Sequence, residues 1–428
     1  MEQRSCITIV TTIALLATVI LHLAYFKYHS KKDEVAPISI LDTTTIAKNQ
    51  LTNGFTIKTR VTTIVNTDIS TRMGIASTLV TTIPSTTKIT STIMHKPFTT
   101  ARSNFGSALL ANGEVLVAGG LITSSSVISE TEVYTSTGWQ LASSMTFSHA
   151  YHTVTAFANN TKVLAAGSDT TRGDQTAEVY NIVSNTWTFT SNNMSSSHYA
   201  HTATLLANGQ ILIAGRYNAS HISISAAELY IPSSNSFINA TNMNIARCYF
   251  TSTLLSDGST VLVTGGANAS SYPVATAELY INGSWILLSS SMTQNWAYHA
   301  AVLLNDGTVL VAGGGNDINN AYSNAEIYNA TTQNFTAVGS MQYRRGGLTL
   351  TLLPSGKVLA TGGADWTSNT YSLVCELYDP LTRTWSSTLM LNHGRSFHHS
   401  VLLNNFVLTT GGYDGNVAGI VTSEKYNL

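Results

Sequence analysis

Charged side chains are scarce in this chain. Only 10% of its 428 residues are Asp, Glu, Lys or Arg, whereas about 25% is typical of soluble domains. The formal net charge is -1, so the chain lacks the basic excess of nucleic-acid-binding proteins, and we expect no nucleic-acid partner. Asn, Ser and Thr supply the polar surface instead, which suits a protein outside the cytoplasm that carries glycans.

Cysteine is scarce as well. The chain has three cysteines and no Cys-x-x-Cys or Cys/His spacing typical of metal sites, which excludes a disulfide-rich scaffold. It also lacks a Gly-x-Ser-x-Gly motif and a Walker loop, the local signatures of many hydrolases and nucleotide-binding proteins. Cys248 and Cys375 could pair in principle, but we expect both to be buried free thiols.

The longest apolar run is Ile7–Phe26, which contains no charged residue apart from the titratable His22. A helix rises about 1.5 Å per residue, so this run is long enough to span a hydrocarbon core of about 30 Å. We therefore predict a short tail (residues 1–6) and one transmembrane signal anchor (residues 7–26). A signal peptide cleaved near Ala24, after a poor small-residue motif, is the alternative.

The sequence features around this segment favour opposite orientations in the membrane. Arg4 precedes it, and Lys27, Lys31 and Lys32 follow it, which by the positive-inside rule favours a cytosolic body. Glycosylation sequons and Thr-rich sequence downstream favour the opposite orientation. We predict a single-pass membrane protein whose body is extracellular or lumenal, with a cytosol-facing interaction scaffold as an alternative.

Residues 27–83 are rich in Thr and Ser and have few aromatics and no regular apolar period. Such a composition is typical of an O-glycosylated stalk or of a flexible linker, and both remain open. We assign residues 84–428 to one folded domain.

A repeat of 48–50 residues fills this domain. An apolar hairpin ends at a glycine in each unit, and these glycines are Gly119, Gly167, Gly215, Gly265, Gly313, Gly362 and Gly411. A Glu-x-Tyr motif follows each time, and its glutamates are Glu132, Glu178, Glu228, Glu278, Glu326, Glu376 and Glu424. Six units then continue with an aromatic residue, and these are Trp139, Trp187, Phe237, Trp285, Phe335 and Trp385.

This pattern resembles the kelch repeat over about three quarters of the chain, Met94 to Leu428, with galactose-oxidase-like propellers as distant relatives. The resemblance implies an all-β, seven-bladed β-propeller with four antiparallel strands per blade. The seventh unit ends at Leu428 before its last strand. We therefore predict that residues near Thr86–Met94 complete the last blade and so remove the open edges.

Local sequence agrees with this fold. The runs "AAVLL" and "TVLVA" are joined by Asp306-Gly307, which predicts a hairpin turn with positive φ at both residues. The near-continuous apolarity of the runs predicts strands that are buried between neighbouring blades. A glutamate that occurs in every blade serves the blade, so we interpret the Glu-x-Tyr column as structural.

Two columns of residues at the start of the innermost strands are candidate binding residues. The first column is Arg102, His149, His198, Arg247, Trp296, Arg345 and Arg395. The second column is Phe105, His152, His201, Phe250, His299, Leu348 and His398. Innermost strands line the channel, so we predict that these columns form a rim at one mouth, and kelch propellers that this chain resembles often bind partners through arginines there.

Such a rim would hold carboxylates, sulfates or sugars through forked hydrogen bonds and stacking. The alternative is that its side chains pair with buried carbonyls and channel water. The loops after the glycines vary most in sequence, and we expect contacts from Asp365-Trp366 and Tyr413-Asp414.

A copper radical oxidase of the galactose-oxidase type is the catalytic alternative. That class needs a Tyr–Cys cross-link and a Tyr-His ligand pair; Tyr151-His152 and Tyr298-His299 have the dipeptide but lie in the repeat columns. Equivalent positions of a propeller are spread around a wide channel, whereas metal ligands must converge on one ion. We therefore expect neither a metal nor another cofactor.

Asn-x-Ser/Thr sequons are candidate glycosylation sites, and those we favour are Asn159, Asn193, Asn218, Asn239, Asn268, Asn282 and Asn329. Asn334 is a further sequon inside a predicted strand. Taken together, the sequence predicts a non-catalytic, membrane-anchored propeller that binds a protein or glycan through its channel mouth and loops, with the membrane contacted through Ile7–Phe26.

Overall fold

The computed structural model describes residues 91–93, 97–123, 126–168, 175–196, 198–217, 222–317, 320–415 and 419–428. The predicted tail, membrane anchor and stalk, as well as Asn218, lie outside these residues. Among the residues described, no helix has the length and apolarity needed to cross a membrane.

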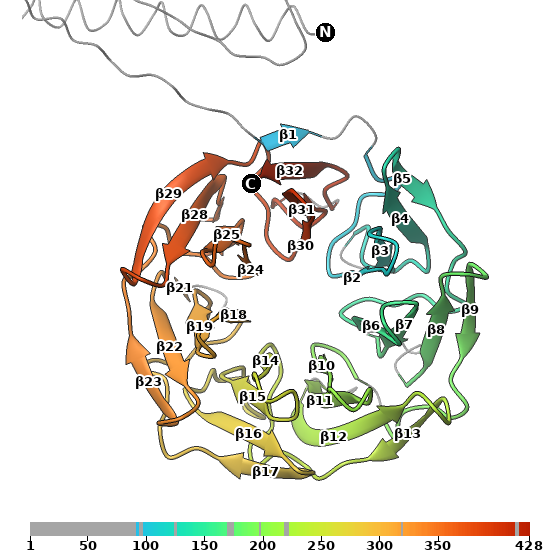
Figure 1. Cartoon of the computed structure of the whole chain (residues 1–428), viewed down its shortest axis with the longest axis horizontal. Helices are drawn as coiled ribbons and strands as arrows, with labels where there is room; N and C mark the ends of the chain where they lie inside the picture. Colours follow the sequence, from blue (N-terminus) through green and yellow to red (C-terminus); the bar gives the residue numbers. More distant parts are fainter. Residues whose placement is uncertain are drawn as a thin grey trace, which may run out of the picture. The chain divides into compact units, whose positions relative to one another are not determined.

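Seven four-stranded antiparallel sheets form a ring of blades, which confirms the predicted all-β, seven-bladed propeller (Figure 1). The first blade contains β2 (Gly106–Leu109), β3 (Val115–Ala118), β4 (Thr131–Thr135) and β5 (Gly138–Leu141). The second contains β6 (Thr153–Phe157), β7 (Lys162–Ala166), β8 (Ala177–Asn181) and β9 (Thr186–Phe189). The third contains β10 (Thr202–Leu205), β11 (Ile211–Tyr217), β12 (Ser223–Ile231) and β13 (Ser236–Asn239).

The remaining blades repeat this order from the channel to the perimeter. The fourth contains β14 (Thr251–Leu254), β15 (Val261–Thr264), β16 (Ala277–Ile281) and β17 (Ser284–Leu287). The fifth contains β18 (Ala300–Leu303), β19 (Val309–Ala312), β22 (Ala325–Asn329) and β23 (Asn334–Ala337). The sixth contains β24 (Thr349–Leu352), β25 (Val358–Thr361), β28 (Val374–Asp379) and β29 (Thr384–Met390).

The seventh blade is built from both ends of the described chain. Its inner strands are β30 (His399–Leu403), β31 (Phe406–Thr410) and β32 (Ser423–Asn427), and its outer strand is β1 (Ser91–Ile93). β1 pairs antiparallel with β32, with Ser91 opposite Tyr426 and Ile93 opposite Glu424. β1 lies inside the segment Thr86–Met94 that the sequence assigns to the last blade, and this pairing joins the two ends of the ring.

The core lies between blades. The second strand of each blade is its most buried one; every residue of β3, β15, β19 and β25 is buried. Leu116 and Val133 of the first blade, for example, pack against Val163 and Tyr180 of the second. Strands sandwiched in this way need apolar side chains on both faces, which explains the near-continuous apolar runs.

The inner hairpins differ in one detail from the sequence prediction. At Asp306-Gly307 only Gly307 has positive φ (82°), and the amide of Gly307 donates to the carbonyl of Leu304 over 3.0 Å. Leu304 also donates to Thr308 over 2.8 Å, so the loop has three residues and ends in a left-handed glycine. The expectation of positive φ at both residues is therefore wrong, because the loop is one residue longer than the tightest hairpin turn.

Two short hairpins lie in loops that follow the glycine positions. They are β20 (Gly315–Asp317) with β21 (Asn320–Ala321), and β26 (Ala364–Asp365) with β27 (Thr370–Tyr371). Backbone bridges connect these loops to the segments that precede the inner strands, as between Ala297 and Gly315 and between Gly346 and Ala364. The loops therefore surround the same end of the channel at which the inner strands begin.

Candidate functional site

The first candidate column does not form a rim. Its side chains are completely buried, and they are Arg102, His149, His198, Arg247, Trp296, Arg345 and Arg395. Arg345 is typical: its Nη1 donates to the carbonyls of Gly362 (2.9 Å) and Val374 (3.0 Å), and its Nη2 donates to Glu376 (2.7 Å). The predicted exposed position of this column is wrong, because each cation is needed inside its own blade to satisfy buried acceptors.

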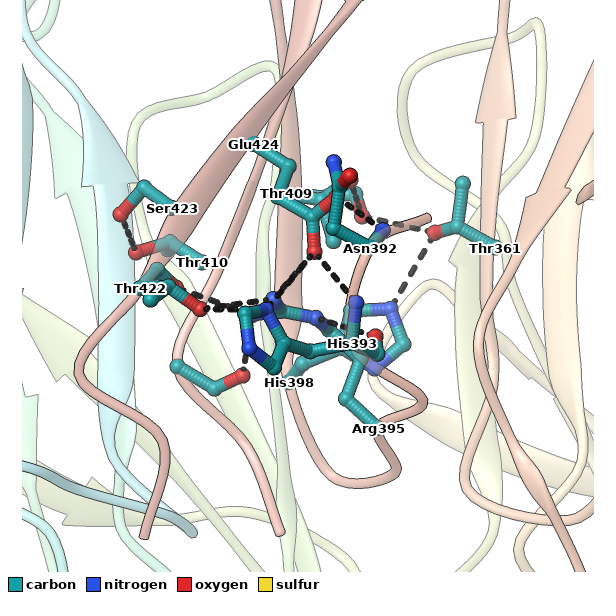
Figure 2. Close-up of polar contacts among 12 residues, drawn as sticks. Thr361, Asn392, His393, Arg395, His398, Thr409, Thr410, Thr422, Ser423 and Glu424 are labelled. Carbon is teal, nitrogen blue, oxygen red and sulfur yellow. Dashed lines mark hydrogen bonds and ion pairs between the residues drawn. The ribbon is translucent and has the colours of Figure 1, made fainter. Parts of the chain in front are cut away.

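The glutamate column completes these networks, which confirms its structural interpretation. Figure 2 shows the seventh blade, where Glu424 accepts hydrogen bonds from Arg395 Nη2 (2.7 Å) and from the backbone amides of Asn392 (2.6 Å) and His393 (3.1 Å). Burial opposes ionisation of Glu424, but the Arg395 charge and these hydrogen bonds outweigh it and lower the pKa of the carboxyl. The glutamate thus ties the loop before an inner strand to the third strand.

Two blades carry histidine in place of arginine. In the third blade His198 Nε2 lies 2.9 Å from Glu228 Oε1 and 2.6 Å from Arg216 Nη1. Arg216 occupies the position that is glycine or serine in the other blades, so its guanidinium fills the volume left by the shorter His198. The third blade therefore still has an arginine beside its buried glutamate, but this arginine comes from a different position of the repeat.

The fifth blade has no cation in the first column. Trp296 occupies that position, and Glu326 is bonded instead by the amide and hydroxyl of Thr293. Glu326 Oε2 and Trp296 Nε1 are buried and have no hydrogen-bond partner in the part of the chain that the structure describes.

The second column lies between blades. His299 Nε2 is 3.0 Å from the hydroxyls of Thr251 and Thr264 in the preceding blade, and His398 Nε2 is 3.1 Å from those of Thr349 and Thr361. Burial, together with the nearby Arg247 charge, lowers the pKa of His299 to about 3. Burial likewise lowers the pKa of the remaining histidines of the column, which are His152, His201 and His398. These imidazoles are therefore neutral at physiological pH.

A third column, between the other two, faces the channel. Every member has a left-handed backbone with φ between 51° and 65°, and the members are Asn104, Tyr151, Ala200, Tyr249, Tyr298, Gly347 and Phe397. Each amide from Tyr151 onward donates to the carbonyl of the preceding member over 2.9–3.2 Å. This belt of backbone hydrogen bonds joins consecutive blades, and the left-handed conformation that it requires presents the side chains to the channel.

Four aromatic rings of this column line a cavity of about 250 Å³, together with Asn104 and members of the second column. The rings of Tyr249 and Tyr298 stack with centroids 4.3 Å apart and planes inclined by 30°. Tyr298 also contacts Phe397 (6.0 Å) and Trp366 (5.4 Å) edge-on. Trp366 was expected as a loop contact residue, and it lies beside the cavity's aromatic cluster.

Two glycines make room for this cluster. A Cβ atom on Gly346 would lie 2.2 Å from the Trp366 ring, and one on Gly347 would lie 3.0 Å from the Phe397 ring. The backbone conformation alone does not demand glycine at Gly347, because the equivalent residues are Tyr, Asn, Ala or Phe at similar φ. Glycine at these two positions leaves space for the rings of Trp366 and Phe397.

The cavity is polar but uncharged. Its lining contains no Asp, Glu, Lys or Arg, and burial raises the pKa of Tyr249 and Tyr298, so both phenols stay protonated. The imidazoles of His152, His299 and His398 are part of the lining, but their Nδ1 atoms are buried and have no hydrogen-bond partner among the described residues. The site thus combines aromatic faces with phenol hydroxyls and the side-chain amide of Asn104.

The imidazoles do not converge on one ion, because Nε2 of His299 and Nε2 of His398 each lie within hydrogen-bond distance of threonine hydroxyls between blades. Within the described ranges, no three His, Cys, Asp or Glu side chains are grouped so that they could hold a metal ion. The buried thiol of Cys248 accepts a hydrogen bond from Ser223 over 3.2 Å, and Cys248 and Cys375 are both free and buried, as predicted.

No protein-family model and no curated protein matches the chain. Among solved structures, a fungal alcohol oxidase of the AA5 family in complex with copper is similar to it, with a TM-score of 0.62 and 16% identity over 79% of this chain and 76% of that one. The structure of YjhT matches with a TM-score of 0.51 and 11% identity, over 78% of this chain and 96% of that one. The fold is that of a seven-bladed β-propeller, consistent with the resemblance to kelch and galactose-oxidase-like propellers that the repeats carry. At these identities the similarity establishes the fold of the propeller and not its chemistry.

The structure therefore changes which residues of the propeller form the candidate site. The sequence predicted the first and second columns as the rim; members of the second line the cavity, those of the first do not, and Tyr249, Phe397 and Gly347 of the third column were missed. The sequence signal for this third column was the recurrence of Tyr two residues after the first column. The left-handed backbone that turns these side chains to the channel cannot be recognised from residues such as Tyr or Phe.

Proposed function

We propose that this propeller is a non-catalytic binding module for a neutral carbohydrate, held in the aromatic cavity at the channel mouth. The observation that carries the proposal is the third column, which presents Tyr151, Tyr249, Tyr298 and Phe397 to one uncharged cavity. We further propose that the body faces the extracellular or lumenal side and is anchored through Ile7–Phe26. The ligand would be a free sugar or the end of a glycan on a partner protein.

The chemistry of the lining favours a sugar. Aromatic faces pack against the C–H faces of a pyranose ring, while the phenols and the side-chain amide of Asn104 exchange hydrogen bonds with its hydroxyls. A cavity of about 250 Å³ is smaller than drug-sized pockets of about 300–1,000 Å³ and matches one sugar residue. Carboxylates and sulfates, which the arginine rim was expected to bind, would be desolvated here without a counter-charge.

The test is a glycan array followed by calorimetry on the full chain. We expect neutral sugars to bind and Tyr298→Ala to weaken binding about tenfold, since an aromatic contact contributes about 0.5–1.5 kcal/mol beyond its buried area. Phe189→Ala is the matched control, because Phe189 is an exposed aromatic on the outer strand β9. Exclusive binding of anionic glycans, or equal affinity in Tyr298→Ala, would overturn the proposal. Stoichiometric copper in the purified protein would favour the oxidase alternative instead.

A further inference from the structure

The outer strands of the propeller are edges without charge. The strands β5, β9, β13, β17, β23 and β29 lie at the perimeter (Figure 1), and none of them contains Asp, Glu, Lys or Arg. Large apolar side chains are exposed along them, namely Leu141, Phe189, Ile238, Ile286, Leu287 and Met390. Proteins usually blunt such edges with charges or proline, because an open edge pairs with the edge of another molecule.

Glycosylation sequons lie along the same perimeter in three consecutive blades. Asn239 ends β13, Asn282 lies in the turn between β16 and β17, and Asn334 begins β23. All three side chains are exposed. Asn239 is next to Ile238, and Asn282 is four residues before Ile286, so both sequons are close in sequence to exposed apolar side chains.

The fifth blade has two sequons so close together that a glycan on one would occupy the space needed by a glycan on the other. Asn329 and Asn334 are opposite each other in the β22–β23 hairpin. Asn329 is half-buried, and its Oδ1 accepts hydrogen bonds from the amides of Thr331 (2.9 Å) and Thr332 (3.1 Å). Asn334 is exposed, so Asn334 rather than Asn329 has room for a bulky substituent.

We propose that N-linked glycans on Asn239, Asn282 and Asn334 cover the uncharged edges of the third, fourth and fifth blades and prevent edge-to-edge association. The reaction joins the side-chain Nδ2 to C1 of an oligosaccharide from a lipid-diphosphate donor; the amide loses one proton and the lipid diphosphate leaves. A mobile hydrophilic glycan at an edge excludes another strand sterically, as a charged side chain does electrostatically. The proposal rests on the outward orientation proposed above but not on the sugar-binding cavity.

Site occupancy is measured by glycopeptide mass spectrometry on the full chain made in animal cells. We expect glycans at all three asparagines and the loss of one glycan in each of Asn239→Gln, Ser284→Ala and Asn334→Gln. Ser284→Ala removes the Asn282 sequon but keeps Asn282, whose φ of 49° suits Asn better than Gln. Asn242→Gln is the control, because Asn242 is exposed, is not a sequon and lies three residues after Asn239.

The pattern of glycan occupancy distinguishes the proposal about the blade edges from the proposal about membrane orientation. Glycans at Asn159 or Asn268 but at none of the three perimeter sites would overturn the edge proposal and leave the outward orientation intact. No glycan at any sequon would overturn both.

Light scattering tests the purpose of the glycans. Enzymatic removal of the glycans from the folded protein is expected to increase scattering over time. Adding Ile238→Lys and Ile286→Lys is expected to lower the scattering of the deglycosylated protein, because a charged edge resists pairing without a glycan. Unchanged scattering after deglycosylation, or no rescue by the lysines, would overturn the role proposed for these glycans.

Discussion

At the scale of single residues, the propeller depends on an ion pair repeated inside its blades. Arg345 and Glu376, for example, are both buried and lie 2.7 Å apart. Such a pair adds little net stability over an apolar pair, but removing one partner leaves an uncompensated buried charge. The pair therefore specifies how the loop and the third strand meet more than it stabilises them.

The sixth and fifth blades allow a comparison of a buried glutamate that is paired with an arginine and one that is not. We expect Glu376→Gln to lower the free energy of unfolding by about 3 kcal/mol, since Arg345 would keep its charge without a counter-ion. Glu326→Gln should lower the free energy of unfolding by about 1 kcal/mol or less, because among the described residues no cation pairs with Glu326 and its Oε2 has no hydrogen-bond partner. Urea denaturation of both variants measures the difference, and equal losses would contradict the account.

At the scale of elements, the loops before the inner strands determine the site. Gly346 and Gly347 admit Trp366 from the β26–β27 hairpin and Phe397 from the next blade to one cluster with Tyr298. The cluster thus joins side chains from the fifth, sixth and seventh blades. Its shape depends on the backbone belt, which is continuous from Asn104 to Phe397.

Gly346→Ala tests this dependence. The added Cβ would overlap the Trp366 ring, so we expect the ring to move and sugar affinity to fall about tenfold. A titration followed by tryptophan fluorescence measures the affinity. The control is Gly113→Ala in an inner hairpin turn, where a Cβ meets no atom within 4 Å although its φ of 80° strains the backbone; a similar affinity loss there would contradict the steric argument.

The closing strand β1 allows a second prediction at this scale. Removing residues 1–96 deletes β1 and exposes the edge of β32, so we expect a lower melting temperature and aggregation. Removing residues 1–82, which lie outside the described residues and before β1, should leave the melting temperature unchanged. Differential scanning calorimetry compares the two truncations, and equal melting temperatures would show that β1 does not stabilise the ring.

At the scale of the whole molecule, the buried histidines make stability depend on pH. Burial lowers the pKa of His152, His201, His299 and His398 in the folded state, while in the unfolded chain it is about 6.5. Between these values the unfolded state binds protons that the folded state does not, so the free energy of unfolding falls as pH decreases from about 6.5. Glutamates with a lowered pKa, such as Glu424, add to this loss below about pH 4.3.

The matched variant is His299→Phe, because Phe250 already occupies the same column. We expect this variant to flatten the dependence of the free energy of unfolding on pH between 4.5 and 6.5, as one titrating group is removed. Urea denaturation at several pH values measures the slope. A slope as steep as that of the unmodified protein would contradict the assignment.

The sequence by itself determined the blades. Periodic glycines, hairpin turns and apolar strands are local features, so they predicted seven repeats, their strands and the structural glutamate without knowledge of contacts. Only the tertiary structure decided which residues face the channel. The arginines of the first column point into their own blades, because they donate hydrogen bonds to buried carbonyls and glutamates that are distant in sequence. Tyr249, Tyr298 and Phe397 point toward the channel because hydrogen bonds between blades hold their backbones left-handed. A sequence does not display interactions that form only when the ring closes.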